Sequence, residues 1–163
     1  MIARRHEYHT DETAEEAVRG ADVVTTATAT RRPIVAADWI APGTHVNAVG
    51  ASTATTRELA TEVVAGAAFF VDHRSAALEE AGELLVPIEE GALDADHIRA
   101  DLGEVASGRH PGRTDDEEIT VFKSVGLAVQ DLAAAAVVIA RAETRQLGRR
   151  VEWERLDAAA ARD

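Results

Sequence analysis

The sequence predicts an α/β fold, a Rossmann-like parallel sheet with flanking helices. Apolar stretches of period 2 alternate along the chain with stretches of period 3.6, which is typical of parallel strands joined by helices. With 163 residues, 46% of them hydrophobic, the chain has the size of one domain with one core. Strands are predicted at 21–26, 44–49 and 67–72, and a further short apolar strand ends near Lys123, the one lysine of the chain.

The segments between these strands show helical patterns. Gly20 is expected to stop a first, acidic helix, because glycine favours helix C-termini. The predicted helices and helical turns are 11–19, 36–40, 56–65, 75–81 and 96–105. Residues 84–87 are expected to be extended, and 108–118 to form a polar loop.

The longest predicted helix covers 124–146. It is nearly continuous in alanine and valine, so we expect it to be buried on most of its circumference. The sequence is accordingly divided into a partial Rossmann-type domain, 1–148, that ends in this buried helix, and a charged C-terminal tail, 149–163.

Charge and composition argue against several classes of partner. The net charge of −12 and the pI near 4.9 disfavour nucleic acid and anionic membranes, which repel an acidic chain. The absence of cysteine excludes disulfides and thiolate metal sites and fits a reducing cytoplasm. No apolar stretch has the length of a membrane span. The pair His6 and His9 has no third ligand nearby, so no metal site is predicted.

The segment after Lys123 offers a candidate ligand site. Free backbone N–H groups at the start of a helix carry partial positive charge, so 124–126 is expected to hold a phosphate, carboxylate or carboxamide group. The alternative is a plain connection from a strand to a helix. Lys123 itself is expected to pair with a nearby acid or a helix end rather than to perform chemistry.

Five segments together resemble the ornithine cyclodeaminase/mu-crystallin family. They are 21–28 (ADVVTTAT), 42–52 (PGTHVNAVGAS), 57–59 (REL), 102–105 (LGEV) and 122–133 (FKSVGLAVQDLA). The resemblance covers about residues 10–148 and corresponds to the later half of a family member. It implies a nicotinamide-binding Rossmann-type domain, here lacking the first Gly-rich βαβ unit because no G-x-G-x-x-G pattern occurs.

The resemblance also implies site residues and an NAD or NADP cofactor. Val125 matches a position that contacts substrate. The cofactor-binding positions that it implies are Thr26, Thr28, Asn47, Val49, Gly50 and Ser124. From the residues alone, hydrogen bonds from the threonines to local backbone at a strand end are an equally good explanation. Gly50 can also form a tight turn, which is compatible with cofactor binding.

Ser52 discriminates between branches of the family. The resemblance places there an aspartate that acts on the substrate amine in the cyclodeaminases. A serine cannot act as a general base at neutral pH without an adjacent activator. Gly50-Ala-Ser52 therefore resembles the imine-reducing branch and leaves Ser52 as the candidate catalytic residue.

The expected function is NAD(P)-dependent chemistry on a small amino or imino acid, leaning to imine reduction. The isolated chain is expected to be inactive, and its partner is either another copy in a homo-oligomer or a complementing N-terminal half. The alternative is a non-catalytic, truncated remnant or an assembly subunit that needs a partner chain.

Overall fold

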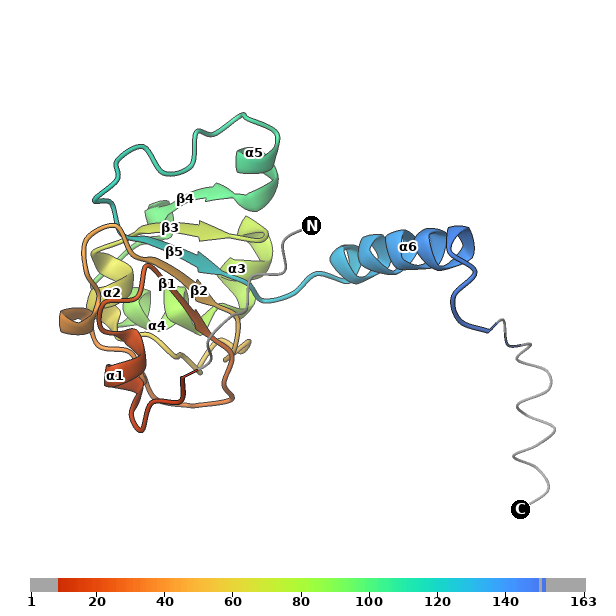
Figure 1. Cartoon of the computed structure of the whole chain (residues 1–163). Coiled ribbons are helices and arrows are strands. Elements are labelled where there is room, and N and C mark those ends of the chain that lie inside the picture. The colour runs from red at the N-terminus through yellow and green to blue at the C-terminus, as the bar shows by residue number, and fades with distance from the viewer. Residues whose placement is uncertain (1–8, 150, 152–163) are drawn as a thin grey trace, which may run out of the picture. The chain divides into compact units, whose positions relative to one another are not determined.

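The computed structural model describes residues 9–149 and 151 and contains a five-stranded, wholly parallel sheet (Figure 1). The strand order is β1-β2-β5-β3-β4. The strands are β1 (Val23–Thr26), β2 (His45–Ala48), β3 (Ala68–Val71), β4 (Ile98–Asp101) and β5 (Thr120–Lys123). The predicted α/β class, the three predicted strands and the strand ending at Lys123 are thus confirmed.

Strand β4 was not predicted. The helix expected at 96–105 is instead a 3-10 turn (Ala95–His97), then β4, then the short helix α5 (Leu102–Ala106). Ile98 and Ala100 are buried while Arg99 between them is exposed, so the segment has the alternation of a strand at a sheet edge.

The helices between strands agree in part with the prediction. They are α1 (Ala14–Val18), α2 (Thr61–Ala65), α3 (Arg74–Glu80) and α4 (Gly82–Glu89), with a 3-10 turn at Ala37–Trp39. Thr13 caps α1 in a capping box with Glu16. The expectation that 84–87 is extended is wrong: these residues lie in α4, where Leu84 and Pro87 are buried. Tertiary burial has outweighed the low helix propensity of proline.

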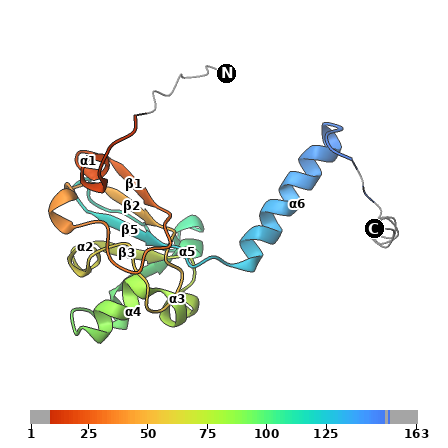
Figure 2. The same cartoon turned by 90° about the horizontal axis from the view of Figure 1, so that it is seen from below.

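The main core lies on one face of the sheet. Figure 2 shows α2, α3 and α4 together on that side. Val46, Phe69, Val71 and Val121 point into this core and are inaccessible to solvent. On the opposite face Phe70 and Ala100 form a second, smaller cluster with Val105 and Phe122. The two faces of the sheet are therefore covered unequally within the described residues.

By its contacts the chain divides into two units, Met1–Gly126 and Leu127–Asp163. The predicted tail, 149–163, lies almost entirely outside the described residues. The long helix, α6 (Ala128–Thr144), begins four residues later than predicted. It was expected to be buried, yet every one of its residues except Ala142 is exposed. No helix among the described residues is long and apolar enough to cross a membrane.

Candidate active site at the carboxyl edge of the sheet

The strand tips lie at one edge, as the site hypothesis requires. In the parallel register Thr26 is opposite Ala48, and Ala48 is opposite Lys123, which also pairs with Val71. The carboxyl ends of β1, β2, β5 and β3 are therefore aligned. Open α/β sheets bind their ligands outside such aligned carboxyl ends.

The tip of β1 is held from inside the protein by Glu58. The buried Thr26 hydroxyl donates a hydrogen bond to Glu58 Oε2 (2.7 Å), and the Thr28 amide donates to Glu58 Oε1 (2.6 Å). The Thr28 side chain itself is exposed. Of the two threonines, Thr26 thus has an internal role, and Thr28 presents its side chain at the edge.

Gly50 is a glycine because protein groups approach it closely. A Cβ atom there would lie 2.2 Å from the Thr28 carbonyl oxygen and 2.5 Å from Glu58 Oε1. Real Cβ atoms do not approach other atoms so closely. The residue therefore allows the close packing of the β1 and β2 ends.

The turn 124–126 has its donors occupied by Asp72. One carboxylate oxygen of this residue, Oδ2, accepts hydrogen bonds from the Ser124 hydroxyl (3.0 Å) and from the Val125 and Gly126 amides (2.9 Å each). The prediction that these N–H groups are free for an anionic ligand is wrong. They also do not start a helix, because α6 begins at Ala128. Asp72 supplies the negative charge that the amides attract.

Replacing Asp72 by alanine is expected to lower the free energy of unfolding by about 1–3 kcal/mol, because part-buried donors lose their acceptor. Ser124→Ala is the matched control. It removes one of the three donors and is expected to cost about 0.5–1.5 kcal/mol. Urea unfolding followed by circular dichroism measures both. Equal losses in the two variants would show that the backbone bonds to Asp72 contribute nothing.

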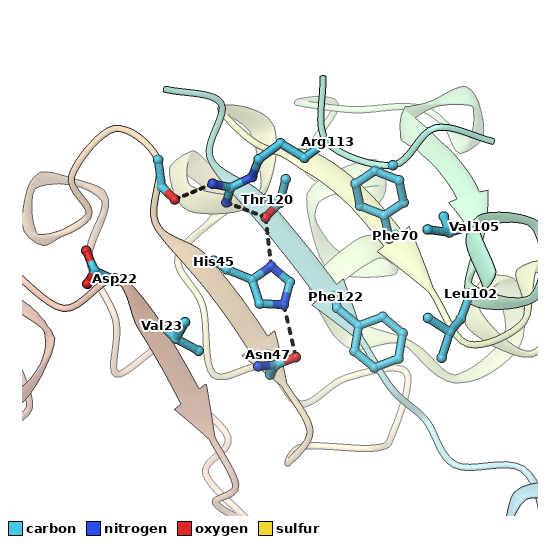
Figure 3. A pocket seen from close by; sticks show the side chains of 12 residues that line it. Asp22, Val23, His45, Asn47, Phe70, Leu102, Val105, Arg113, Thr120 and Phe122 are labelled. Atoms are coloured by element: carbon cyan, nitrogen blue, oxygen red, sulfur yellow. Dashed lines mark hydrogen bonds between the residues drawn. The ribbon is translucent and has the colours of Figure 1, made fainter. Parts of the chain in front are cut away.

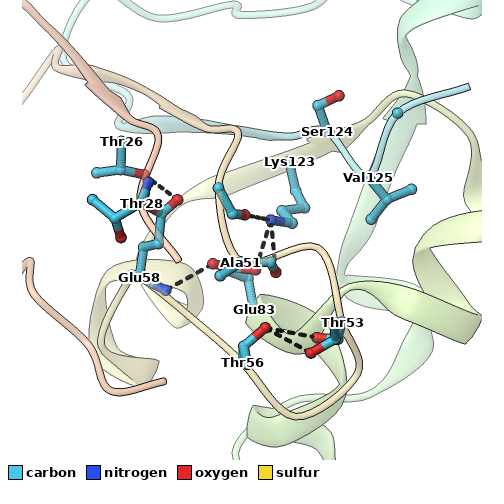
Figure 4. Close-up of polar contacts among 12 residues, drawn as sticks. Thr26, Thr28, Ala51, Thr53, Thr56, Glu58, Glu83, Lys123, Ser124 and Val125 are labelled. Carbon is cyan, nitrogen blue, oxygen red and sulfur yellow. Dashed lines mark hydrogen bonds and ion pairs between the residues drawn. The ribbon is translucent and has the colours of Figure 1, made fainter. Parts of the chain in front are cut away.

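Lys123 points into the core at the tip of β5, and its ammonium group is fully buried (Figure 4). It forms an ion pair with Glu83 Oε2 (3.0 Å), and it donates to the carbonyl oxygens of Gly50 (2.6 Å) and Ala51 (3.4 Å). The prediction that Lys123 pairs with an acid is confirmed. Burial raises the pKa of Glu83, and the neighbouring Lys123 charge opposes this rise.

Asn47 does not lie at the edge with the other predicted residues. It points to the less covered face of the sheet, where a cavity of about 720 Å³ lies (Figure 3). Asn47 Oδ1 is hydrogen-bonded to His45 Nε2 (3.1 Å), and His45 Nδ1 is hydrogen-bonded to the Thr120 hydroxyl (2.7 Å). Phe70, Phe122 and Leu102 add apolar surface to the cavity. This cavity is thus on the sheet face rather than at the strand tips.

Val49 and Ser52 follow β2 and are exposed, Val49 to 46%. Together with Thr28 they give the edge one apolar side chain and two hydroxyls. No cluster of side chains that would hold a metal ion occurs among the described residues.

Three acids at this edge were missed or underestimated from the sequence. Asp72 entered as the last residue of a predicted strand, Glu58 only as part of the 57–59 motif, and Glu83 was not singled out. A signal was present for the last two: each directly precedes a fully buried leucine. A carboxylate buried beside such a leucine needs a hydrogen-bond or ion-pair partner, and Lys123 is the one lysine in the sequence.

The comparisons with known proteins agree with this geometry. The model of the ornithine cyclodeaminase/mu-crystallin family matches residues 6–146. Ketimine reductase mu-crystallin of Mus musculus is 48% identical over 124 residues, 76% of this chain and 37% of that protein. The chain spans less than half the length of the curated relatives that it matches.

Two solved structures are similar over most of the described fold. One is Thermococcus litoralis Delta(1)-pyrroline-2-carboxylate reductase in complex with NADH and L-proline, with a TM-score of 0.81 and 39% identity over 86% of this chain and 44% of that one. The other is an archaeal alanine dehydrogenase dimer with bound NAD, with a TM-score of 0.76 and 40% identity over 86% of this chain and 43% of that one. This chain therefore belongs to the ornithine cyclodeaminase/mu-crystallin family.

Proposed function

We propose that this chain forms the nicotinamide side of an NAD(P)-dependent enzyme that reduces the C=N bond of a small imino acid, or oxidises the corresponding amino acid. The observation that carries the proposal is the alignment of four strand tips at one edge, where Thr28, Val49 and Ser52 are exposed. Similar proteins solved with NADH and L-proline, or with NAD, support it.

The proposed reaction requires few chemical groups from this chain. A bound reduced nicotinamide would supply a hydride to the imine carbon and leave in its oxidised form, and the imine nitrogen would take up one proton to become an amine. Val49 is proposed to lie against the cofactor ring, with the Thr28 and Ser52 hydroxyls available for hydrogen bonds. Ser52 in place of an aspartate leaves no carboxylate at this position to drive a cyclising deamination, which favours the imine-reducing branch.

Titration with NADH and with NADPH, followed by nicotinamide fluorescence, tests the proposal. We expect saturable binding that is weakened at least tenfold by Val49→Asp, because a carboxylate at the edge repels the cofactor phosphates and is desolvated on binding. Ala92→Asp is the matched control. It adds the same charge at an exposed loop residue after α4 and is expected to leave binding unchanged. Equal binding by both variants would place the cofactor elsewhere.

We further propose that the partner is a polypeptide corresponding to the part of the relatives' length that this chain does not match. Two open surfaces support this. The first is strand β1, which lies at an edge of the sheet and has Val23 60% exposed. The second is the cavity on the sheet face, which Val23 lines together with Phe70 and Phe122. Such surfaces are normally covered.

Size-exclusion chromatography with light scattering, with and without the unmatched N-terminal part of mouse mu-crystallin, tests this partner. A one-to-one complex is the expected result. A stable homo-oligomer that excludes the added polypeptide would contradict it.

A second candidate is a non-catalytic assembly subunit. The observation that favours it is the occupation of the Ser124–Gly126 donors by Asp72, which leaves those groups unavailable to a ligand. In the titration above, absence of NADH and NADPH binding by a chain with a folded circular-dichroism spectrum would select this candidate.

A further inference from the structure

A closed ring of polar contacts joins five separate segments beneath the strand tips (Figure 4). Lys123 Nζ donates to the Gly50 and Ala51 carbonyls, and the Ala51 amide donates to the Thr28 carbonyl (3.0 Å). The Thr28 amide donates to Glu58, and the Glu58 amide donates to Glu83 Oε1 (2.8 Å). The other Glu83 oxygen meets Lys123 and closes the ring.

The ring is shielded from solvent at its charged members. Glu58, Glu83 and Lys123 each have 0% exposure. Lys123 Nζ donates hydrogen bonds to two carbonyl oxygens and forms an ion pair with one carboxylate oxygen of Glu83. Hydrogen bonds are stronger in such a dry environment, so the ring constrains the backbone that it contacts.

The constrained backbone is unusual at one position. Ala51 adopts φ of 50°, in the left-handed region that residues other than glycine seldom adopt, and its side chain is buried. Such conformations persist where the surroundings hold them, and they concentrate at functional sites. Ala51 lies between Gly50 and Ser52, so its conformation sets where the Ser52 side chain points.

The loop after Ser52 is held on its far side as well. A Cβ at Gly82 would lie 2.0 Å from the Thr56 carbonyl oxygen, and the Thr53 and Thr56 hydroxyls are hydrogen-bonded (2.7 Å). Residues 50–56 are thus anchored at both ends, by the ring and by the start of α4. Ser52 is exposed between the two anchors.

We propose that Lys123 is a positioning residue: paired with Glu83, it holds the Gly50–Ser52 turn in the conformation that presents Val49 and Ser52 to the nicotinamide cofactor. The role in cofactor binding rests on the proposed function. The claim that Lys123 holds the turn in place rests only on the ring of polar contacts. Lys123 itself touches neither cofactor nor substrate, because it is fully buried on the core side of β5.

The test uses Lys123→Met combined with Glu83→Gln, which removes both charges of the ion pair together. Amide hydrogen exchange by NMR is the first readout. The Ala51 amide, protected by Thr28, is expected to exchange at least tenfold faster than in the unaltered chain after the change in global stability is subtracted. Leu84→Ala is the control, since it destabilises α4 next to Glu83 without touching the ring, and it should accelerate Ala51 and the β2–β5 amides in proportion. An Ala51 rate that follows the sheet amides in both proteins would overturn the proposal.

NADH affinity is the second readout. The double variant is expected to bind at least tenfold more weakly than Leu84→Ala. Equal affinities, despite faster Ala51 exchange, would show that the turn is held for stability alone and would overturn its role in cofactor binding. If the unaltered chain binds no NADH, the proposed function fails, while the exchange experiment still decides whether Lys123 holds the turn.

Discussion

Lys123→Met alone is expected to lower the free energy of unfolding by about 3–5 kcal/mol at neutral pH. The reason is the carboxylate left behind. Glu83 remains fully buried in α4, and the ammonium group that faced it 3.0 Å away is gone. An uncompensated buried charge is among the most destabilising changes that a single substitution makes. Urea unfolding at neutral pH measures the loss.

The same variant is expected to gain stability as the pH falls. Burial already raises the pKa of Glu83 above its ordinary value near 4.5, and Lys123 opposes the rise, so removing Lys123 raises the pKa further. The folded variant then keeps a proton on Glu83 at pH values where the unfolded chain has released it. This contribution to stability is complete below 4.5 and is lost as the pH rises through the folded pKa.

Lys123→Met with Glu83→Gln serves as the control for both effects. Without an ionisable group at position 83, this protein should recover a large part of the lost stability and show none of the pH dependence that Lys123→Met adds. Unfolding curves at pH 5 and pH 7.5 separate the cases. A single variant as stable as the double one at both pH values would mean that Glu83 finds another partner.

Gly50→Ala is expected to destabilise the protein by about 1–3 kcal/mol or more, because the added methyl group overpacks a closely packed site. The atoms that it would meet are the backbone nitrogen and oxygen of Thr28, at 2.4 and 2.2 Å, and Glu58 Oε1. Backbone atoms cannot turn away as the end of a flexible side chain can. The strand tips are therefore expected to separate, and Glu58 to lose its bond to Thr28.

Gly103→Ala is a matched control in α5. Its added Cβ would meet no atom within 4 Å, and its φ is not positive, so we expect a stabilisation of about 0.5–1 kcal/mol from the helix propensity of alanine. Thermal unfolding of the two variants measures the difference. A melting temperature for Gly50→Ala equal to that of the unaltered chain would disprove the close packing at the tip.

The sequence predicted β1, β2, β3 and β5 because their apolar runs are short and bounded by turns. It failed at β4, where Ile98-Arg-Ala-Asp101 has only two buried positions, and the glutamate and leucine that follow suggested a helix. It also failed at α4, where Pro87 argued for an extended chain. In both cases packing against the rest of the fold outweighed local preference.

The alignment of the strand ends was predictable, but the hydrogen-bond partners of the groups at these ends were not. Strand ends in a parallel fold lie together, which placed Thr26, Thr28, Gly50 and Ser52 at one edge. The carboxylates that hold this edge come from elsewhere in the chain: Glu58 lies 30 residues beyond Thr28, and Asp72 lies 52 residues before Ser124. Patterns within a short window carry no information on such pairings, which depend on the folded topology.

The strand order also bears on how the protein is made. β5 pairs with both β2 and β3, yet it is the last of the five strands to leave the ribosome. Until β5 is made, the sheet lacks the strand that joins β1-β2 to β3-β4, and Glu83 lacks the cation with which it pairs. Because contacts between residues distant in sequence form slowly, we expect the pairing of β5 with β2 and β3 to be a late step in folding.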